Sequence, residues 1–160
     1  MAFTVEDGSI IASSNSYVNI AYADAYHSDR SNTLWVGDET AKQAALIKAT
    51  DYIEHKYNNR FKGELVDAYQ ALSFPRYDVQ GVLGNEIPTS LKDAVCLLAL
   101  EALSTDLCPN TETGAIKREK TDIVETEYFE GASVGITRPA ISGLLRGLLK
   151  NRRCVKVVRV

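Results

Sequence analysis

Asp51, Glu54 and His55 are the side chains whose types and spacing come closest to a catalytic set. Residues three and four positions apart lie on one face of a helix, which would place two carboxylates beside an imidazole. The spacing departs from the HxxEH zinc motif, because Asp51 stands where that motif has its first histidine. The same pattern is typical of an exposed polar helix face, which is the interpretation we favour. A small hydrolase around His55 is the alternative.

Two further motifs fail to predict an enzyme. Asp24, His27 and Ser28 have the residue types of a hydrolytic triad, but all three fall on one short predicted helix and no Gly-x-Ser-x-Gly turn accompanies them. Residues 81–84 read Gly-Val-Leu-Gly, without the Gly-Lys-Ser/Thr ending of a phosphate-binding loop. We therefore predict no catalytic residues, no enzymatic activity and no cofactor.

Residues that could ligate a soft metal are few. The three cysteines, Cys96, Cys108 and Cys154, form no Cys-x-x-Cys pair, and only two histidines could join them. An odd number of unclustered cysteines predicts neither a zinc site nor a disulfide framework. A reducing compartment fits this composition, and no secretory signal is expected at the N-terminus.

Aromatic and basic residues alternate in two segments, 57–62 and 74–77. Stacking aromatics next to cations are what proteins use to hold single-stranded nucleic acid. Aromatic rings flanked by arginine also pack into protein cores while the guanidinium reaches solvent, and we favour this interpretation. The residues concerned are Tyr57, Arg60, Phe61, Lys62, Phe74, Arg76 and Tyr77.

Charge is distributed unevenly along the chain. Residues 138–160 contain seven basic residues and no acid, whereas the first 137 residues carry a formal charge of −10. Opposed ends predict either an anionic partner or head-to-tail contact between copies, although a solvated basic end is equally compatible. The predicted partner-binding residues lie in the tail: Arg152, Arg153, Val155, Lys156, Val157, Val158, Arg159 and Val160.

Capping residues and apolar spacing predict four helices, of which two lie in the first 60 residues. The first covers 20–29 behind Asn19, with Ala21, Ala25 and Tyr26 on one face. The second starts at a capping box of Thr40 and Gln43 and ends near 58–59. Its apolar stripe consists of Leu46, Ala49, Ile53 and Tyr57.

The other two helices follow a long predicted connection over 63–88. The third starts at a capping box of Ser90 and Asp93 and runs to about 107, with Leu91, Val95, Leu98 and Ala102 at helical spacing. Because residues 94–100 are apolar all round, we predict that the other helices cover it; this run is far shorter than the roughly 20 residues that span a membrane. The fourth covers 140–150 behind Pro139, with Gly143 and Gly147 permitting close packing.

Strand-forming residues are confined to the last third of the chain. Residues 116–129 predict a ribbon with Val124, Thr126 and Tyr128 on one face, followed by a turn at 130–131. Residues 155–160 predict a strand at a free end. The predicted fold class is therefore mainly α: a small domain of about four helices with a minor β ribbon and a C-terminal strand-like tail. We expect a helical domain over 1–151, with its ribbon near 115–130, and a basic, valine-rich tail over 152–160.

Four fragments occur in an order that is typical of one family. They are Ser16-Tyr17-Val18, residues 21–26, residues 45–57 and the loop motif of residues 70–76, in which Leu72, Phe74, Pro75 and Arg76 are the most specific and Phe74 replaces the commoner tryptophan. With the basic, valine-rich end, these fragments resemble the head-tail connector (adaptor, or head-completion) family of tailed phages and prophages. Some relatives in that family are described as DnaT-like single-strand-binding proteins.

The resemblance implies a structural adaptor that joins a phage capsid to its tail and extends the DNA exit channel. Expected partners are the portal protein, a tail-completion or tail-terminator protein and further copies in a ring, a dodecamer in the virion, with double-stranded DNA passing through and no membrane contact. The expected location is the head-tail junction of the virion, after synthesis in the host cytoplasm. The alternative function is a single-stranded DNA-binding module.

Overall fold

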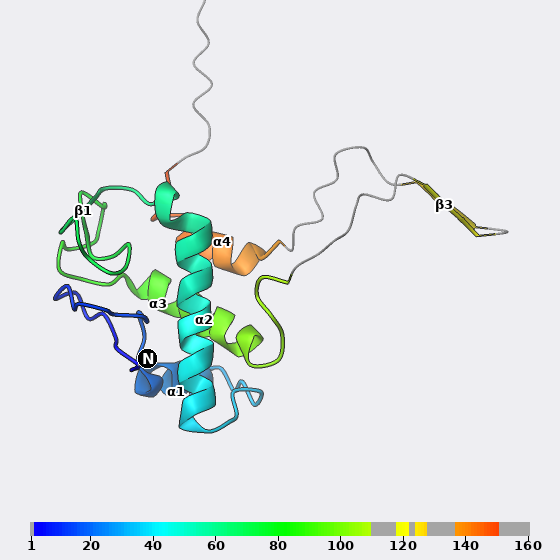
Figure 1. Cartoon of the computed structure of the whole chain (residues 1–160), viewed down its shortest axis with the longest axis horizontal. Coiled ribbons are helices and arrows are strands. Elements are labelled where there is room, and N and C mark those ends of the chain that lie inside the picture. The colour runs from blue at the N-terminus through cyan, green and yellow to red at the C-terminus, as the bar shows by residue number, and fades with distance from the viewer. Residues whose placement is uncertain (1, 110–117, 122–123, 128–136, 151–160) are drawn as a thin grey trace, which may run out of the picture.

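The chain folds as a small helical domain with two short antiparallel strand pairs (Figure 1). The computed structural model describes residues 2–109, 118–121, 124–127 and 137–150. Its elements are α1 (Ile20–Asp29), α2 (Glu39–Tyr57), the 3-10 turn η1 (Asn58–Arg60), β1 (Glu64–Leu65), β2 (Arg76–Tyr77), α3 (Thr89–Ala102), β3 (Arg118–Thr121), β4 (Val124–Glu127) and α4 (Pro139–Leu145). The predicted mainly α fold class is confirmed.

Helix α1 has the predicted bounds and the predicted cap, since Asn19 accepts a hydrogen bond from the backbone N–H of Tyr22 at 2.8 Å. Its buried face differs from the prediction: Ala23, Tyr26 and His27 are buried, whereas the predicted Ala21 and Ala25 are exposed. Alanine is too small to direct a helix face, and the two rings set the orientation.

Helix α2 begins at a different cap from the predicted one. Asp38, not Thr40, accepts the N-terminal hydrogen bond, from the backbone N–H of Ala41 at 2.8 Å. An acid one residue before the helix provides the same acceptor two positions earlier, together with a charge that suits the helix N-terminus. The predicted stripe is confirmed, because Leu46, Ala49, Ile53 and Tyr57 are all buried.

Helix α3 is the central helix, as predicted: it contacts α1, α2 and α4. The predicted capping box is wrong, because α3 starts after Pro88 with no side-chain cap. It also ends at Ala102, about five residues before the predicted end. The carbonyl of Glu101 accepts from the hydroxyl groups of Ser104 and Thr105 as well as from their backbone N–H groups, so the last turn of α3 ends in a local network on one carbonyl.

Helix α4 ends at Leu145, whereas the prediction extended it to 150. Beyond it the chain pairs with the segment that follows α2, through Lys62 N–H to Leu148 C=O at 2.8 Å and Lys150 N–H to Arg60 C=O at 2.7 Å. These backbone hydrogen bonds replace the helical ones. The predicted close packing at Gly143 and Gly147 is wrong within the described chain, because a Cβ at either would meet no atom within 4 Å.

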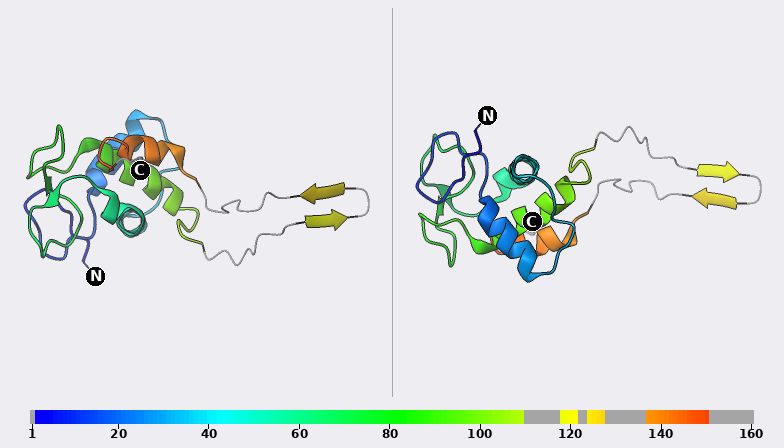
Figure 2. Two further views of the ribbon diagram at one scale, coloured as in Figure 1. Left: turned by 90° about the horizontal axis from the view of Figure 1, so that it is seen from above. Right: turned by 90° about the horizontal axis from the view of Figure 1, so that it is seen from below.

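Strands β3 and β4 form an antiparallel ribbon in which Arg118 pairs with Glu127 and Thr121 with Val124. Within the described ranges the ribbon contacts no other helix or strand, and Figure 2 shows it apart from the helical domain. This confirms the strands predicted in 116–129. The predicted turn at 130–131 and the predicted tail strand lie outside the described residues.

Candidate functional site

The family-motif loop is a buried structural element. Leu72, Phe74, Pro75 and Arg76 are all buried, and the Phe74 ring meets the Phe61 ring edge-on with centroids 5.0 Å apart. Phe61 follows η1, so this contact fixes the long 63–88 connection against the end of α2. The specific part of the motif therefore serves packing.

Arg76 holds this connection through three backbone carbonyl groups. Its guanidinium donates to Lys62 C=O and Gly63 C=O, both at 2.8 Å, and to Ser73 C=O at 3.2 Å. Only 8% of the residue is exposed, and this burial lowers the pKa of Arg76. At Gly63, which has φ +71°, a Cβ would lie 1.9 Å from the Tyr77 carbonyl oxygen. The Arg76 guanidinium and Gly63 thus fix the connection between β1 and β2, and neither is free to bind a ligand.

A second polar network joins this loop to α2 and to the N-terminal segment. The Tyr17 hydroxyl donates to Glu54 and accepts from Phe74 N–H at 3.2 Å, while the Ser73 hydroxyl donates to Glu54 at 2.5 Å. Burial, followed by the Glu54 charge and hydrogen bond, raises the pKa of Tyr17 well above its usual range. Glu54 is therefore committed to the interior.

The catalytic set considered from the sequence is not assembled. Asp51 and His55 are exposed on α2, whereas the Glu54 carboxylate is occupied by Tyr17 and Ser73. The structure thus agrees with the favoured interpretation of a polar helix face for Asp51 and His55. In the other polar set, Asp24 accepts from Trp35 and Lys42, and Ser28 is exposed without joining them.

The aromatic and basic segments are mainly core. Tyr57, Phe61 and Phe74 are buried, and Arg76 is turned toward carbonyl groups. Tyr77 is 53% exposed and is the one ring of this set that a base could reach. The favoured packing interpretation is confirmed for the rings of Tyr57, Phe61 and Phe74, but the Arg76 guanidinium is buried against carbonyl groups and does not reach solvent as expected.

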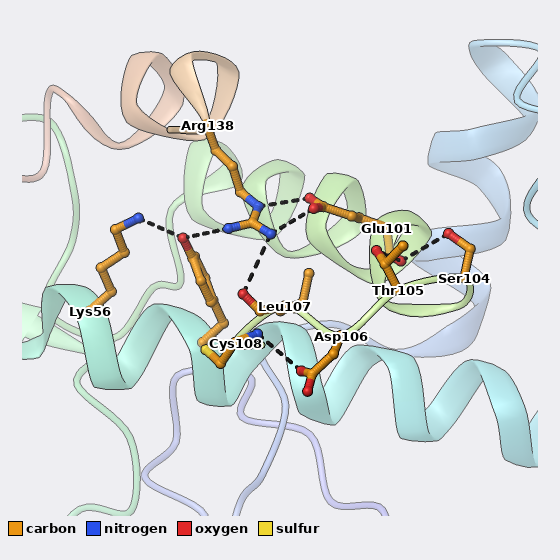
Figure 3. A network of polar contacts seen from close by, with 9 residues as sticks. Lys56, Glu101, Ser104, Thr105, Asp106, Leu107, Cys108 and Arg138 are labelled. Atoms are coloured by element: carbon orange, nitrogen blue, oxygen red, sulfur yellow. Dashed lines mark hydrogen bonds and ion pairs between the residues drawn. The ribbon is translucent and has the colours of Figure 1, made fainter. Parts of the chain in front are cut away.

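Arg138, just before α4, contacts α2, α3 and the segment that follows α3 (Figure 3). Its Nε and Nη2 donate to both oxygens of Glu101, at 2.8 and 2.6 Å, and Nη1 donates to the Tyr52 hydroxyl at 2.9 Å. Nη2 also reaches Leu107 C=O at 3.5 Å. Arg138 therefore joins the segment after α3 to the start of α4.

Arg138 and Glu101 form a tight ion pair. The hydrogen bond from Arg138 lowers the pKa of Glu101, and the same hydrogen bond raises the pKa of Arg138. The guanidinium carbon also lies 4.8 Å from the centroid of the Tyr52 ring, a cation–π arrangement. Sequence reasoning missed this role, because nothing in the local pattern connects Arg138 with an acid 37 positions earlier.

An open pocket of about 520 Å³ lies beside Tyr52, one of the partners of Arg138, between α2 and residues 102–108. Its polar lining includes Lys48 and His55 as well as the acids Asp51 and Asp106. Across the described ranges, no group of three or more histidine, cysteine, aspartate or glutamate residues could hold a metal ion. No described helix is long and apolar enough to cross a membrane.

The predicted tail residues, 152–160, lie outside the described chain, so their placement is not tested. The described chain contains a buried motif loop, a ribbon that contacts no other described helix or strand, and the contacts of Arg138 with α2 and α3, which we call the Arg138 clamp. This arrangement offers surfaces for binding but no assembled catalytic group among the described residues.

Comparison with known proteins gives one match. A family model described as "Putative DnaT-like ssDNA binding protein" matches residues 1–160. No curated protein and no solved structure matches the chain. This description coincides with the label carried by some of the relatives that the sequence fragments resemble. The match spans the whole length, and the chain belongs to this DnaT-like family.

Proposed function

We propose that the protein is a structural adaptor that assembles with copies of itself into a ring at the portal vertex of a phage, where it joins capsid to tail. The observation that carries this proposal is the β3–β4 ribbon, which contacts no other helix or strand of the described chain. Each strand of an isolated pair keeps one edge of unpaired backbone groups, and such edges pair readily with another chain.

Two further features support an assembly role. Arg138 joins α2 and α3 at the start of α4, so the helical domain from which the ribbon extends is held together at this point. The acidic first 137 residues and the basic remainder are complementary between copies, and head-to-tail contacts of this kind close into rings when the rotation permits. The order of the fragments that resemble the head-tail connector family agrees with this role.

Electron microscopy of the purified protein, with and without portal particles, tests the adaptor function. We expect rings, either alone or seated on portal particles, and a higher sedimentation coefficient for the mixture. A variant in which residues 118–127 are replaced by a Gly-Ser linker of equal length should keep its helical circular dichroism and lose assembly. A protein that stays monomeric at every concentration and ignores portal particles would overturn the proposal.

A second candidate function is single-stranded DNA binding, which the family match favours. In this case the basic residues of 138–160 would contact phosphates, while exposed aromatics such as Tyr69 and Tyr77 would stack on bases. Asp67 and Asp78 lie next to these rings in sequence and oppose phosphate binding there. The family match supports this function, and the described surface carries only part of the candidate interface, because residues 151–160 lie outside the described chain.

A gel shift at several salt concentrations separates the two functions. A DNA-binding module should bind oligonucleotides of any sequence, with an affinity that falls steeply as salt increases. Replacing both Arg152 and Arg153 by alanine should weaken that binding and flatten its salt dependence, whereas replacing the exposed acids Asp67 and Asp78 should not weaken it. An adaptor should show no such binding while forming rings.

A further inference from the structure

The loop between α1 and α2 is held in one conformation by a cluster of polar and aromatic contacts. Trp35 Nε1 and Lys42 Nζ both donate to Asp24 Oδ1, at 2.6 and 2.8 Å. The backbone N–H of Asn32 donates to His27 C=O at 2.9 Å, and the Asn32 amide also meets His27 Nδ1 at 3.0 Å. The Trp35 and His27 rings lie with centroids 4.6 Å apart.

This fixed loop places two apolar side chains in solvent. Leu34 is 76% exposed and Val36 is 68% exposed, on either side of the buried Trp35. A loop whose backbone is already ordered loses less conformational entropy on binding than a flexible one, so such a loop suits a protein contact. We call Leu34 and Val36 the apolar tip.

The surroundings of the apolar tip are acidic. In the sequence Asp29 precedes the apolar tip and Asp38 and Glu39 follow it, and all three are exposed. Of the nearby cations, Lys42 is paired with Asp24, and the Arg30 guanidinium lies 3.6 Å from the Tyr26 ring centroid with Asp93 at 4.0 Å. A complementary partner therefore combines positive charge with small apolar side chains.

The chain itself contains such a segment. Residues 151–160 read Asn-Arg-Arg-Cys-Val-Lys-Val-Val-Arg-Val, with four basic residues, four valines and no acid. Its charge is opposite to that of the loop, and its valines match the apolar tip in character. Charge complementarity of this kind directs a partner to its site and fixes its orientation.

The geometry favours the tail of another copy over the chain's own tail. Lys150 is hydrogen-bonded to Arg60, just beyond the C-terminal end of α2, whereas the apolar tip precedes the N-terminal end of α2 (Figure 1). With 19 residues, α2 is roughly 28 Å long. Ten residues reach at most about 36 Å when fully extended, so the chain's own tail would have to lie straight along the helix to arrive.

We propose that the apolar tip of the α1–α2 loop binds residues 151–160 of a second copy of this chain. This inference rests on the proposed assembly function and names the contact that links neighbouring copies. Each copy then gives its tail at one end of α2 and receives a tail at the other.

Disulfide cross-linking through the natural Cys154 tests the contact in the full chain. In a Cys108→Ser background, Leu34→Cys or Val36→Cys should give dimers and longer multimers on a non-reducing gel. The multimers should disappear on reduction or with Cys154→Ser. Leu83→Cys is the matched control, because Leu83 is also an exposed apolar residue, at 69%, but lies in the 63–88 connection.

Three results would overturn the inference: equal cross-linking by the Leu83→Cys control, no cross-linking at position 34 or 36, or a cross-linked monomer alone, which would show that each tail binds its own chain. A second variant separates this contact from the proposed function. The double substitution Leu34→Ser and Val36→Ser should weaken self-association at least tenfold in sedimentation experiments. If this variant still forms rings of normal stability, the adaptor function stands and the proposed contact is wrong.

Discussion

Tyr17 illustrates how single side chains connect distant parts of this fold. Its hydroxyl donates to Glu54 and accepts from Phe74 N–H, so one oxygen joins the N-terminal segment, α2 and the motif loop. Tyr17→Phe leaves the buried N–H of Phe74 without its acceptor and removes one donor from Glu54. We expect a loss of about 1–3 kcal/mol in the free energy of unfolding, measured by urea denaturation.

The matched control for this substitution is Tyr69→Phe, since Tyr69 is almost fully exposed. It should change stability by no more than about 0.5 kcal/mol in either direction. Equal stability of Tyr17→Phe and the unmodified chain would show that the buried network contributes nothing.

His27 makes stability depend on pH. Burial lowers the pKa of His27 below its ordinary value of 6.5, so the folded chain keeps the ring neutral where the unfolded chain begins to protonate it. The free energy of unfolding should therefore be unaffected by this group above about pH 7 and should fall as pH decreases from 7 to 5. Thermal unfolding at closely spaced pH values measures this fall.

The charged neighbours of His27 do not reverse this sign. Burial raises the pKa of Asp24, but hydrogen bonds from Lys42 and Trp35 outweigh it, so the pKa is lowered overall and Asp24 stays ionised between pH 7 and 5. The variant His27→Gln should lose most of the pH dependence in this window, whereas His55→Gln, at an exposed position, should retain it. An unchanged pH profile in His27→Gln would assign the dependence to another group.

Individual residues differ in how well the sequence predicted them. The stripe Leu46, Ala49, Ile53 and Tyr57 is predictable because helical periodicity alone decides which face is apolar. The role of Glu54 is not, because its partners come from segments far away in the chain and the local pattern suggests an exposed acid. The same limit applies to Arg76, whose three carbonyl partners depend on the tertiary path of the 63–88 connection.

Arg138 governs the connection between elements, since it joins α4 to α3 and α2. Arg138→Met should remove the ion pair and leave Leu107 C=O without this donor. We expect a loss of about 1–3 kcal/mol in the free energy of unfolding and faster amide hydrogen exchange in residues 104–109.

Two readouts distinguish this effect from a general loss of packing. The pKa of Glu101, which the hydrogen bond from Arg138 holds below its usual range, should rise toward its ordinary value in Arg138→Met when followed by NMR. Arg146→Met is the matched control, because Arg146 is exposed just beyond the end of α4. It should leave both the exchange rates and the Glu101 titration unchanged.

Element positions follow from the sequence better than element boundaries do. Pro88 and Pro139 mark the starts of α3 and α4 because proline is accepted only in the first turn or just before a helix. The ends of these helices depend on other partners: the Ser104 and Thr105 hydroxyls bind the Glu101 carbonyl, and the chain after Leu145 pairs with residues 60–62. Propensity alone does not reveal these partners.

At the scale of the whole molecule, the tail should contribute to assembly and not to folding. Deleting residues 152–160 should leave the melting temperature and the circular dichroism unchanged, since we propose that the tail makes its contacts with other copies. Self-association, measured by sedimentation, should be lost. A full-length chain whose tail is replaced by a Gly-Ser segment is the control for chain length, and early melting of the truncated chain would contradict the prediction.

The mainly α architecture was predictable from the sequence because apolar spacing survives without tertiary information, and the family match bears out the DnaT-like label of some relatives, whereas the head-tail connector identity stays a proposal. The isolation of the ribbon and the fixed α1–α2 loop were not, because each depends on which contacts a segment makes or lacks in space. Leu34 and Val36 show this limit, since no local pattern distinguishes them as exposed beside the buried Trp35.

The backbone pairing of Lys150 with Arg60 gives the molecule a direction, because it holds Lys150 near the C-terminal end of α2 while the apolar tip precedes the N-terminal end. Copies joined by the proposed contact between tail and apolar tip would all have the same orientation along the assembly. A copy without its tail should still receive the tail of a neighbour but should not bind the next copy. A small proportion of truncated copies mixed with intact ones should therefore stop further addition and prevent rings from closing.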